Sequence, residues 1–328
     1  MILIFTNKED IHPTPVIEKL REWDVPFFRF NTECLLTDYS FQWWCDENGA
    51  DFRLENTING DIIHGHDVTA IWDRRAEPPK AQRFIFEEPE INKMILDEAR
   101  GFLSFLRYYL KDVYSIGSIA ADRVAGSKML QLSMASKLGA SIPRTYFSNR
   151  KNPAHDFFKG TEALSIKPIS VDSFYLDGEH EYVFFSQKRS FNEVFAQSDD
   201  AFEHTASFIQ EYIEKQYELR VTVCCDELIA CKIDSQSQKE GEGKEDWRQG
   251  YEFGLKHEII DVPDIIKSFC YKYLQKLNLR FGCFDFIVTP SNDYIFLECN
   301  PNGQWYWIEL ETGADISGII AKHLANPS

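Results

Sequence analysis

The chain has 328 residues, of which 44% are hydrophobic and 14% aromatic, and its formal net charge is -17. This composition predicts one or two folded units with sizeable cores and argues against disorder, and the acidic balance argues against a nucleic-acid partner, which needs a basic surface. The sequence contains no basic signal region and no run of about 18 apolar residues, so we expect neither secretion nor a membrane partner. Its eight scattered cysteines include no C-x-x-C pair, which indicates free thiols in a reducing cytoplasm.

Strand and helix signals alternate through the first third of the chain. Residues 1–6, 26–31 and 68–75 have strand character, and residues 12–24 and 87–110 show helical spacing of apolar side chains. Residues 41–54 alternate around Asn48-Gly49, which is typical of a hairpin. We therefore expect a small α/β domain over residues 1–118. His64 and His66 share one face of a strand, but with no third ligand in sight we do not expect a metal site there.

A second unit begins with a helix expected over residues 127–138, whose Leu130, Met134 and Leu138 recur at helical spacing. Strands are expected at 162–170 and 181–187, and residues 216–236 form a strand pair that turns at Asp226-Glu227. The clearest helical pattern lies at 261–279, and a hairpin over residues 281–303 follows it.

The last hairpin carries the strongest chemical signal. An apolar run from Ile295 to Leu297 ends in Glu298 and Asn300, although polar groups are costly to bury without partners. Side chains alternate along a strand, so Glu298 and Asn300 point the same way, and Asp285 lies in the partner strand. Three oxygen donors with room for phosphates favour a magnesium–nucleotide site, and the alternative is three satisfied polar groups at a strand end.

Residues 282–309, GCFDFIVTPSNDYIFLECNPNGQWYWIE, resemble the metal-binding hairpin of ATP-grasp carboxylate–amine ligases. Their tail, NPNGQWYWIE, is more narrowly similar to the graspetide maturases of the microviridin, plesiocin and "grasp-with-spasm" type, which install ω-ester and ω-amide crosslinks in ribosomal peptides. The resemblance extends from about Trp72 onward. It implies an ATP-grasp fold with an N-terminal pre-ATP-grasp domain at 1–118 and an ATP-grasp domain at 119–328, whose first lobe is 119–207 and whose second lobe, with the metal site, is 208–328.

The resemblance also implies roles for individual residues. It assigns magnesium to Asp285, Glu298 and Asn300, and it places Arg220 and Arg248 beside the transferred phosphate as catalytic groups. The residues expected to bind ATP are Lys128, Lys167, Gln210, Glu211, Tyr212, Ile213 and Glu218. Taken alone, each lysine is more often a solvated surface group. Arg74 and Arg75 are expected to contact an acidic peptide substrate, with a structural ion pair as the alternative.

The implied activity is an ATP- and magnesium-dependent peptide macrocyclase. It would activate Asp or Glu side chains of a precursor peptide, made of a leader and a core, as acyl phosphates and join them to Thr or Ser hydroxyls or to Lys amines. A homodimer is a further expectation from the family. Two alternatives stay open: a ligase adding amino acids to a small molecule or a protein C-terminus, and a nucleotide-dependent peptide-binding module without turnover. The loop after Lys167 departs from the family because it has one glycine and several acidic residues.

Overall fold

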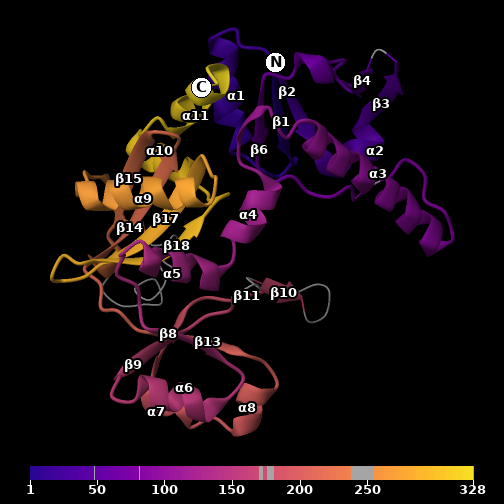
Figure 1. Ribbon diagram of the computed structural model, residues 1–328. Helices are drawn as coiled ribbons and strands as arrows, with labels where there is room; N and C mark the ends of the chain where they lie inside the picture. The colour runs from indigo at the N-terminus through magenta and orange to yellow at the C-terminus, as the bar shows by residue number, and fades with distance from the viewer. Residues whose placement is uncertain (48, 81, 170–172, 176–180, 238–253, 328) are drawn as a thin grey trace.

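A computed structural model describes residues 1–327 apart from 48, 81, 170–172, 176–180 and 238–253. Its first sheet is parallel with strand order β2-β1-β6-β7, and Figure 1 labels β2, β1 and β6 side by side. Every residue of β1 is buried, as its apolar sequence predicts. The strands are β1 (Ile2–Thr6), β2 (Phe27–Asn31), β6 (Ala70–Asp73) and β7 (Tyr114–Ile116). The helices of this part are α1 (Pro13–Glu22), η1 (Thr32–Cys34), α2 (Leu35–Asp38) and α3 (Pro89–Tyr109).

An antiparallel sheet follows α2 and contains the expected hairpin, but Gly49 pairs with Asp46 as the first residue of its second strand instead of lying in the turn, and Asn48 lies outside the described residues. It is formed by β3 (Tyr39–Asp46), β4 (Gly49–Asn56) and β5 (Ile62–His64), and the short helix η2 (Gly65–Asp67) continues directly from β5. Phe52, Leu54 and Ile63 are fully buried in a cluster that also contains Leu103 and Leu106 of α3. The apolar face of this sheet therefore packs toward α3 and leaves the other face outward.

The middle of the chain forms a second sheet with the order β12-β9-β13-β8. Its strands are β8 (Thr145–Ser148), β9 (Ala163–Ile166), β12 (Gln187–Ser190) and β13 (Ser207–Glu211), and a separate pair is formed by β10 (Ser173–Tyr175) and β11 (Glu181–Val183). The helices here are α4 (Ile119–Ala125), α5 (Lys128–Lys137), α6 (Lys151–Phe158), α7 (Phe191–Phe195) and α8 (Asp199–Glu203). A small cluster that includes Phe158, Leu164 and Phe202 joins α6, α7 and α8 to this sheet.

A five-stranded antiparallel sheet with the order β16-β15-β14-β17-β18 forms the last part of the fold. Its strands are β14 (Tyr217–Cys224), β15 (Glu227–Ile233), β16 (His257–Ile259), β17 (Phe281–Val288) and β18 (Tyr294–Asn300), and η3 (Ser235–Ser237) follows β15. Helix α9 (Asp264–Lys276) covers one face, where Phe269 packs against Phe284 and Phe296. The predicted helix and the predicted β17–β18 hairpin are thus confirmed.

The turn between β14 and β15 lies one residue earlier than expected. Cys224 pairs with Glu227, so the turn residues are Cys225 and Asp226. Cys225 adopts a left-handed φ of 55°, which a tight two-residue hairpin requires. The sequence does not predict this conformation, because such turns favour Gly, Asn or Asp.

The C-terminal helices α10 (Tyr306–Thr312) and α11 (Ile316–Ala325) return to the first sheet, and α11 packs against α1 (Figure 1). One hydrophobic cluster contains Ile4 and Trp72 from the first sheet together with Trp305 and Ile320 from the C-terminal end. The two ends of the chain are therefore held by a shared core. Among the helices described, none is long and apolar enough to span a membrane. All eight cysteines are free thiols, six of them buried.

Candidate active site

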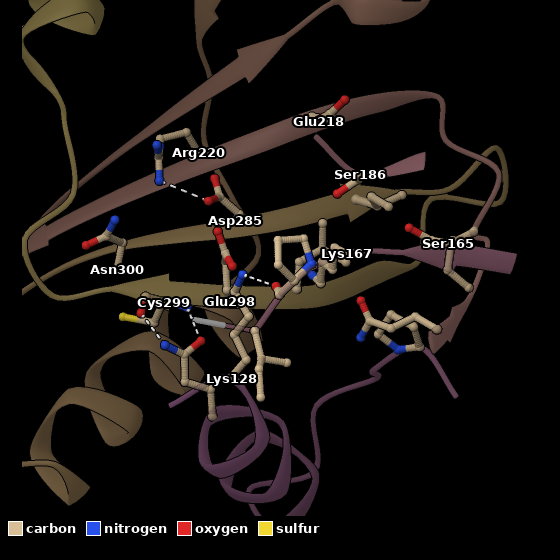
Figure 2. Close-up of a pocket in the computed structure, with 18 of the residues that line it drawn as sticks. Lys128, Ser165, Lys167, Ser186, Glu218, Arg220, Asp285, Glu298, Cys299 and Asn300 are labelled. Carbon is tan, nitrogen blue, oxygen red and sulfur yellow. Dashed lines mark hydrogen bonds and ion pairs between the residues drawn. The ribbon is translucent and has the colours of Figure 1, made fainter. Parts of the chain in front are cut away.

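A cleft of about 540 Å³ opens between the β12-β9-β13-β8 sheet and the five-stranded sheet. Its walls come from the ends of β9 and β13 on one side and from β14, β17 and β18 on the other, and the first turn of α5 closes one end (Figure 2). Almost every residue expected to bind nucleotide or metal lines this cleft: Lys128, Lys167, Gln210, Glu211, Tyr212, Ile213, Glu218, Arg220, Asp285, Glu298 and Asn300. Residues more than 150 positions apart in the chain are thereby brought together.

Three charged side chains form a row across adjacent strands. Arg220 of β14 lies opposite Asp285 of β17, and Asp285 lies opposite Glu298 of β18. The Arg220 guanidinium donates to Asp285 Oδ2 at 3.0 Å. Figure 2 shows Asp285 and Glu298 directed toward one another, with Asn300 beside them. Two carboxylates directly opposite each other repel, so this row favours an additional cation between them.

A β-bulge makes this row. Phe286 pairs with Phe296, but Asp285 pairs with Glu298, so Leu297 is an extra residue in β18. In a regular strand Glu298 would share the face of Phe296 and enter the core against α9. The extra residue turns Glu298 to the cleft instead, and both Leu297 and Glu298 line it. This explains how an apolar run ends in a carboxylate without burying an unpaired charge.

A residue that the sequence did not indicate fixes the backbone of this segment. Gln131 of α5 is 4% exposed and accepts a hydrogen bond from the Cys299 amide at 3.0 Å. Its Nε2 donates to the carbonyls of Cys299 at 2.8 Å and Ala125 at 2.6 Å. Because Cys299 lies between Glu298 and Asn300, Gln131 orients both. The helix therefore turns Gln131 inward, and Leu130, expected on the core face, is 36% exposed.

Both predicted nucleotide lysines line the cleft, Lys128 from α5 and Lys167 from the end of β9. Lys128 is the first residue of α5, and its Nζ donates to the Pro168 carbonyl at 2.8 Å. Lys167 directly follows β9, and its ammonium lies 5.8 Å from the centre of the Phe208 ring. Figure 2 shows both lysine side chains reaching into the space beside Glu298. Cations beside carboxylates suit a polyphosphate that is bound together with a metal ion.

The segment from Gln210 to Ile213 joins the two sheets along the wall of the cleft. Gln210 is 3% exposed and donates to Thr145 Oγ1 at 2.9 Å. The amide of Glu211 donates to the Arg144 carbonyl, and the amide of Tyr212 donates to the Ala163 carbonyl. These bonds fix the backbone of the segment, so its remaining polar groups are presented in one arrangement.

Glu218 forms a buried ion pair that sequence reasoning missed. Lys215 Nζ lies 2.5 Å from Glu218 Oε1, and the Ser235 hydroxyl donates to the same oxygen at 3.2 Å. Each of Lys215 and Glu218 is 9% exposed, and both line the cleft. Charges three residues apart face each other on a helix, but Lys215 precedes β14 and Glu218 lies in it, so their spacing in the sequence did not indicate this pair.

The three remaining arginines are placed differently from one another. Arg75 is exposed and lines the cleft. Arg74 does not line it: the side chain is 1% exposed, and its Nε donates to Asp10 Oδ2 at 2.9 Å. It therefore makes the structural ion pair that was the alternative to peptide contact. Arg248 lies outside the described residues, as does most of the acidic loop that follows Lys167.

Arg74 also ties the first sheet to the end of β18. Its Nη1 donates to the carbonyls of Asn302 at 2.7 Å and Gly303 at 3.0 Å. Burial alone would raise the pKa of Asp10, but the hydrogen bond from His12 and the charge of Arg74 lower that pKa to about 2. Asp10 therefore stays ionised at neutral pH, and burial of the His12 ring lowers its pKa.

Comparison with known proteins agrees with this geometry. The chain matches the RimK-like ATP-grasp domain family over residues 125–324. The RiPP-associated ATP-grasp ligase of Chryseobacterium gregarium, solved with ADP and with a leader and core peptide, is 26% identical, with a TM-score of 0.89 over 100% of this chain and 97% of its own. The macrocyclase MdnC of Microcystis aeruginosa MRC, solved with the precursor peptide MdnA, is 25% identical, with a TM-score of 0.83 over 99% of both chains.

The ligase PsnB, solved with a precursor variant, Mg and ADP, shares the fold at 18% identity, with a TM-score of 0.74 over 98% of this chain and 97% of its own. No curated protein matches the sequence. The family match covers more than half of the chain, and the solved ligases extend the likeness to nearly all of it. The expected ATP-grasp fold is confirmed, and the chain belongs to the RimK-like ATP-grasp family.

Proposed function

We propose that the protein is an ATP- and magnesium-dependent ligase that closes rings in a ribosomal precursor peptide. The observation that carries this proposal is the cleft itself, in which two lysines, an arginine and the Asp285–Glu298–Asn300 group face one space. Support also comes from the full-length likeness to ligases solved with precursor peptides and, in the Chryseobacterium case, with ADP.

The residues present suit magnesium. Two carboxylates and an amide oxygen are hard donors, and Asp285 and Glu298 lie directly opposite each other on adjacent strands, where a divalent cation would relieve their repulsion. Asp285, Glu298 and Asn300 would hold the ion. Bound there, magnesium would neutralise charge on the β- and γ-phosphates of ATP.

The reaction that this arrangement supports has two steps. A carboxylate oxygen of the peptide attacks the γ-phosphorus and the bond to the β-bridging oxygen breaks. ADP leaves, and the peptide carboxylate has become an acyl phosphate. A Thr or Ser hydroxyl, or a Lys amine, then attacks the acyl carbon, loses its proton, and phosphate leaves. Lys128 and Lys167 offset the charge of the phosphates, and Arg220 stabilises the charge that develops during transfer. Holding both side chains of one peptide together makes ring closure effectively unimolecular.

We assign the wall from Gln210 to Ile213 to the adenine and Glu218 to the ribose hydroxyls. Because the amides of Glu211 and Tyr212 already donate within the protein, the Glu211 carbonyl and the Ile213 amide are the groups we assign to the base. Lys215 orients the Glu218 carboxylate through their buried pair. Arg248 is proposed to act with Arg220 at the phosphate.

The substrate and the division of the chain are part of the same proposal. We expect a precursor with a leader and with a core rich in Thr or Ser and in Asp or Glu, and Arg75 at the cleft is the group we assign to its acidic side chains. Residues 1–118 would form the N-terminal domain, 119–207 the first lobe and 208–328 the second lobe. Eight free thiols support a cytoplasmic location, and the net charge of -17 argues against nucleic acid as a partner.

A second copy of the chain is the other partner we propose. Phe84 and Ile85, which precede α3, are 76% and 77% exposed, and Met94 within α3 is 58% exposed. Figure 1 shows α3 extending away from the rest of the molecule. Exposed apolar groups gathered in this way are typical of an interface. Light scattering that returns the mass of a single chain at all concentrations would contradict a homodimer.

The experiment that tests the function uses the purified protein, ATP, Mg²⁺ and a Thr/Glu-rich precursor encoded beside it. We expect the product to lose one water for each ring, and we expect Asp285→Asn and Glu298→Gln to abolish both this loss and the peptide-stimulated release of phosphate. A gain of mass would indicate an amino-acid ligase instead. Peptide binding without phosphate release would indicate a module without turnover.

A further inference from the structure

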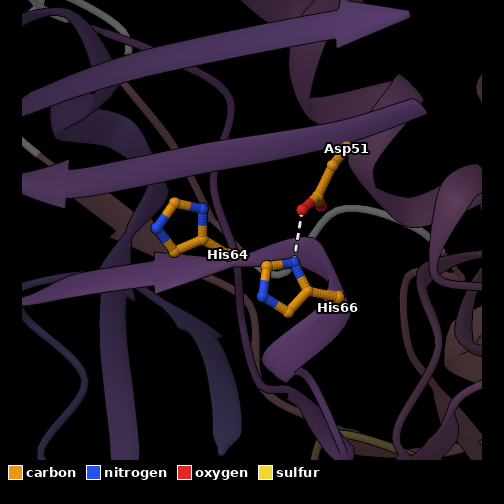
Figure 3. Close-up of side chains that lie close together, drawn as sticks. All are labelled: Asp51, His64 and His66. Atoms are coloured by element: carbon orange, nitrogen blue, oxygen red, sulfur yellow. Dashed lines mark hydrogen bonds and ion pairs between the residues drawn. The ribbon is translucent and has the colours of Figure 1, made fainter. Parts of the chain in front are cut away.

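Two histidines that the sequence left unexplained meet a third ligand on the outer sheet of the first domain. His64 ends β5, His66 lies in η2, and Asp51 comes from β4. His66 Nδ1 lies 2.5 Å from Asp51 Oδ2, and the two imidazoles are stacked with ring centres 5.3 Å apart. One ligand atom from each of the three side chains lies within 4.8 Å of the others (Figure 3).

Gly65, between the two histidines, is what admits the carboxylate. A Cβ at this position would lie 2.4 Å from Asp51 Oδ1 and 2.9 Å from the Phe52 ring, so no other residue fits. Oδ1 also accepts the Phe52 amide at 2.8 Å. One carboxylate oxygen is therefore held by the backbone while the other, Oδ2, is directed at the His66 imidazole. The His-Gly-His spacing and the position of Asp51 thus form one arrangement.

The scaffold beneath these side chains is closely packed. Phe52 and Ile63, their neighbours on β4 and β5, are fully buried, and the Tyr109 hydroxyl of α3 donates to the Ala50 carbonyl at 2.6 Å. The Trp44 ring meets His64 edge-on at 6.4 Å. Ligands on packed strands need little reorganisation to bind an ion, which is what separates a site from a chance surface cluster.

We propose that Asp51, His64 and His66 bind a divalent transition-metal ion, and that zinc is the ion they suit best. Two imidazoles and one carboxylate are ligands that zinc accepts, whereas magnesium and calcium favour oxygen alone. In a tetrahedral zinc site neighbouring ligand atoms lie roughly 3.3 Å apart, so the 2.5 Å pair must open, the wider pairs must close, and at least one of the stacked imidazoles must turn so that its ring nitrogen faces the ion. The His66 side chain is 68% exposed, so the fourth position faces solvent. This site is separate from the cleft and does not depend on the proposed function.

The test is a zinc titration of the full-length protein after treatment with a chelator. Binding is measured by calorimetry in excess Mg²⁺. Cobalt is the second probe, because its visible absorption is much stronger in a tetrahedral protein site than in the octahedral aqua ion. We expect one zinc to bind and to raise the unfolding temperature. Loss of an outer-sphere partner weakens metal binding about 10- to 100-fold, so His64→Gln, His66→Gln and Asp51→Asn should each weaken it at least about 10-fold.

His66→Gln is the decisive variant because an exposed side chain can be replaced without disturbing the core. The matched control is His323→Gln, which removes the histidine of the other described cluster of this kind, Asp226–Glu227–His323, and should leave zinc binding unchanged. Zinc affinity unaffected by His66→Gln and His64→Gln would overturn the proposal. So would affinity lost in His323→Gln or in Asp285→Asn, since the ion would then bind at the other cluster or in the cleft.

Discussion

Arg74 provides the sharpest test of how the first sheet supports the cleft. Arg74→Met removes the guanidinium from an ion pair whose side chains are 1% and 2% exposed. Leaving one buried charge without its partner costs about 3–5 kcal/mol, and the carbonyls of Asn302 and Gly303 lose their donor as well. Asp10 keeps its hydrogen bonds from His12, which places the expected loss near the lower end, at about 3 kcal/mol.

The assay is urea unfolding followed by tryptophan fluorescence, since Trp305 is fully buried with its ring 5.3 Å from that of His12. Arg75→Met is the matched control: its side chain is exposed, so we expect a loss below about 0.5 kcal/mol together with a weaker affinity for peptide. Arg74 is among the groups that lower the His12 pKa. Its removal relieves one of the causes that lower this pKa, so we expect the loss to be no larger at pH 5.5 than at pH 8. A loss below about 1 kcal/mol at both pH values would refute this reasoning.

Three further predictions concern groups around the cleft and the β14–β15 turn. Gln131→Leu leaves the Cys299 amide and carbonyl unpaired, at about 1–3 kcal/mol for each group, and should weaken Mg·ATP binding in fluorescence titrations; unchanged stability would contradict the anchoring role. Burial raises the Asp122 pKa to about 7, despite a hydrogen bond from Asn302. The folded state therefore holds a proton that the unfolded state releases near pH 4, so stability falls as pH rises from about 4 to 7, and Asp122→Asn should flatten that fall in urea unfolding. Two hydrogen bonds, one with Cys224 and one with the Tyr114 hydroxyl, lower the Cys225 pKa to about 6. Iodoacetamide should therefore modify Cys225 at pH 7 ahead of the six buried thiols, and mass spectra with Cys225 unmodified would exclude this.

Much of the second half of the chain followed from periodicity. The α9 pattern and the β17–β18 hairpin were predictable because apolar spacing alone distinguishes a covered helix from paired strands. That Asp285 and Glu298 come together across the hairpin was predictable for a related reason. Carboxylates beside buried aromatic residues need a partner.

Other features were not accessible because they depend on contacts between distant segments. Nothing in the α5 sequence shows that Gln131 meets the backbone of Cys299, 168 residues away. Strict alternation along β18 hides the bulge at Leu297, and one extra residue reverses which side chains face the cleft. Asp51 could not be joined to His64 and His66 without the register of β4 and β5.

The bulge at Leu297 divides the last hairpin into two parts that meet different physical requirements. Up to Phe296 the strand is constrained by how well it fills space against α9, and from Glu298 onward by where it presents its oxygens. Because the extra residue absorbs the mismatch, mutations that reshape the first part need not propagate into the second. Such insulation offers a physical route by which chains only 26% identical can diverge in their cores and keep the same architecture throughout.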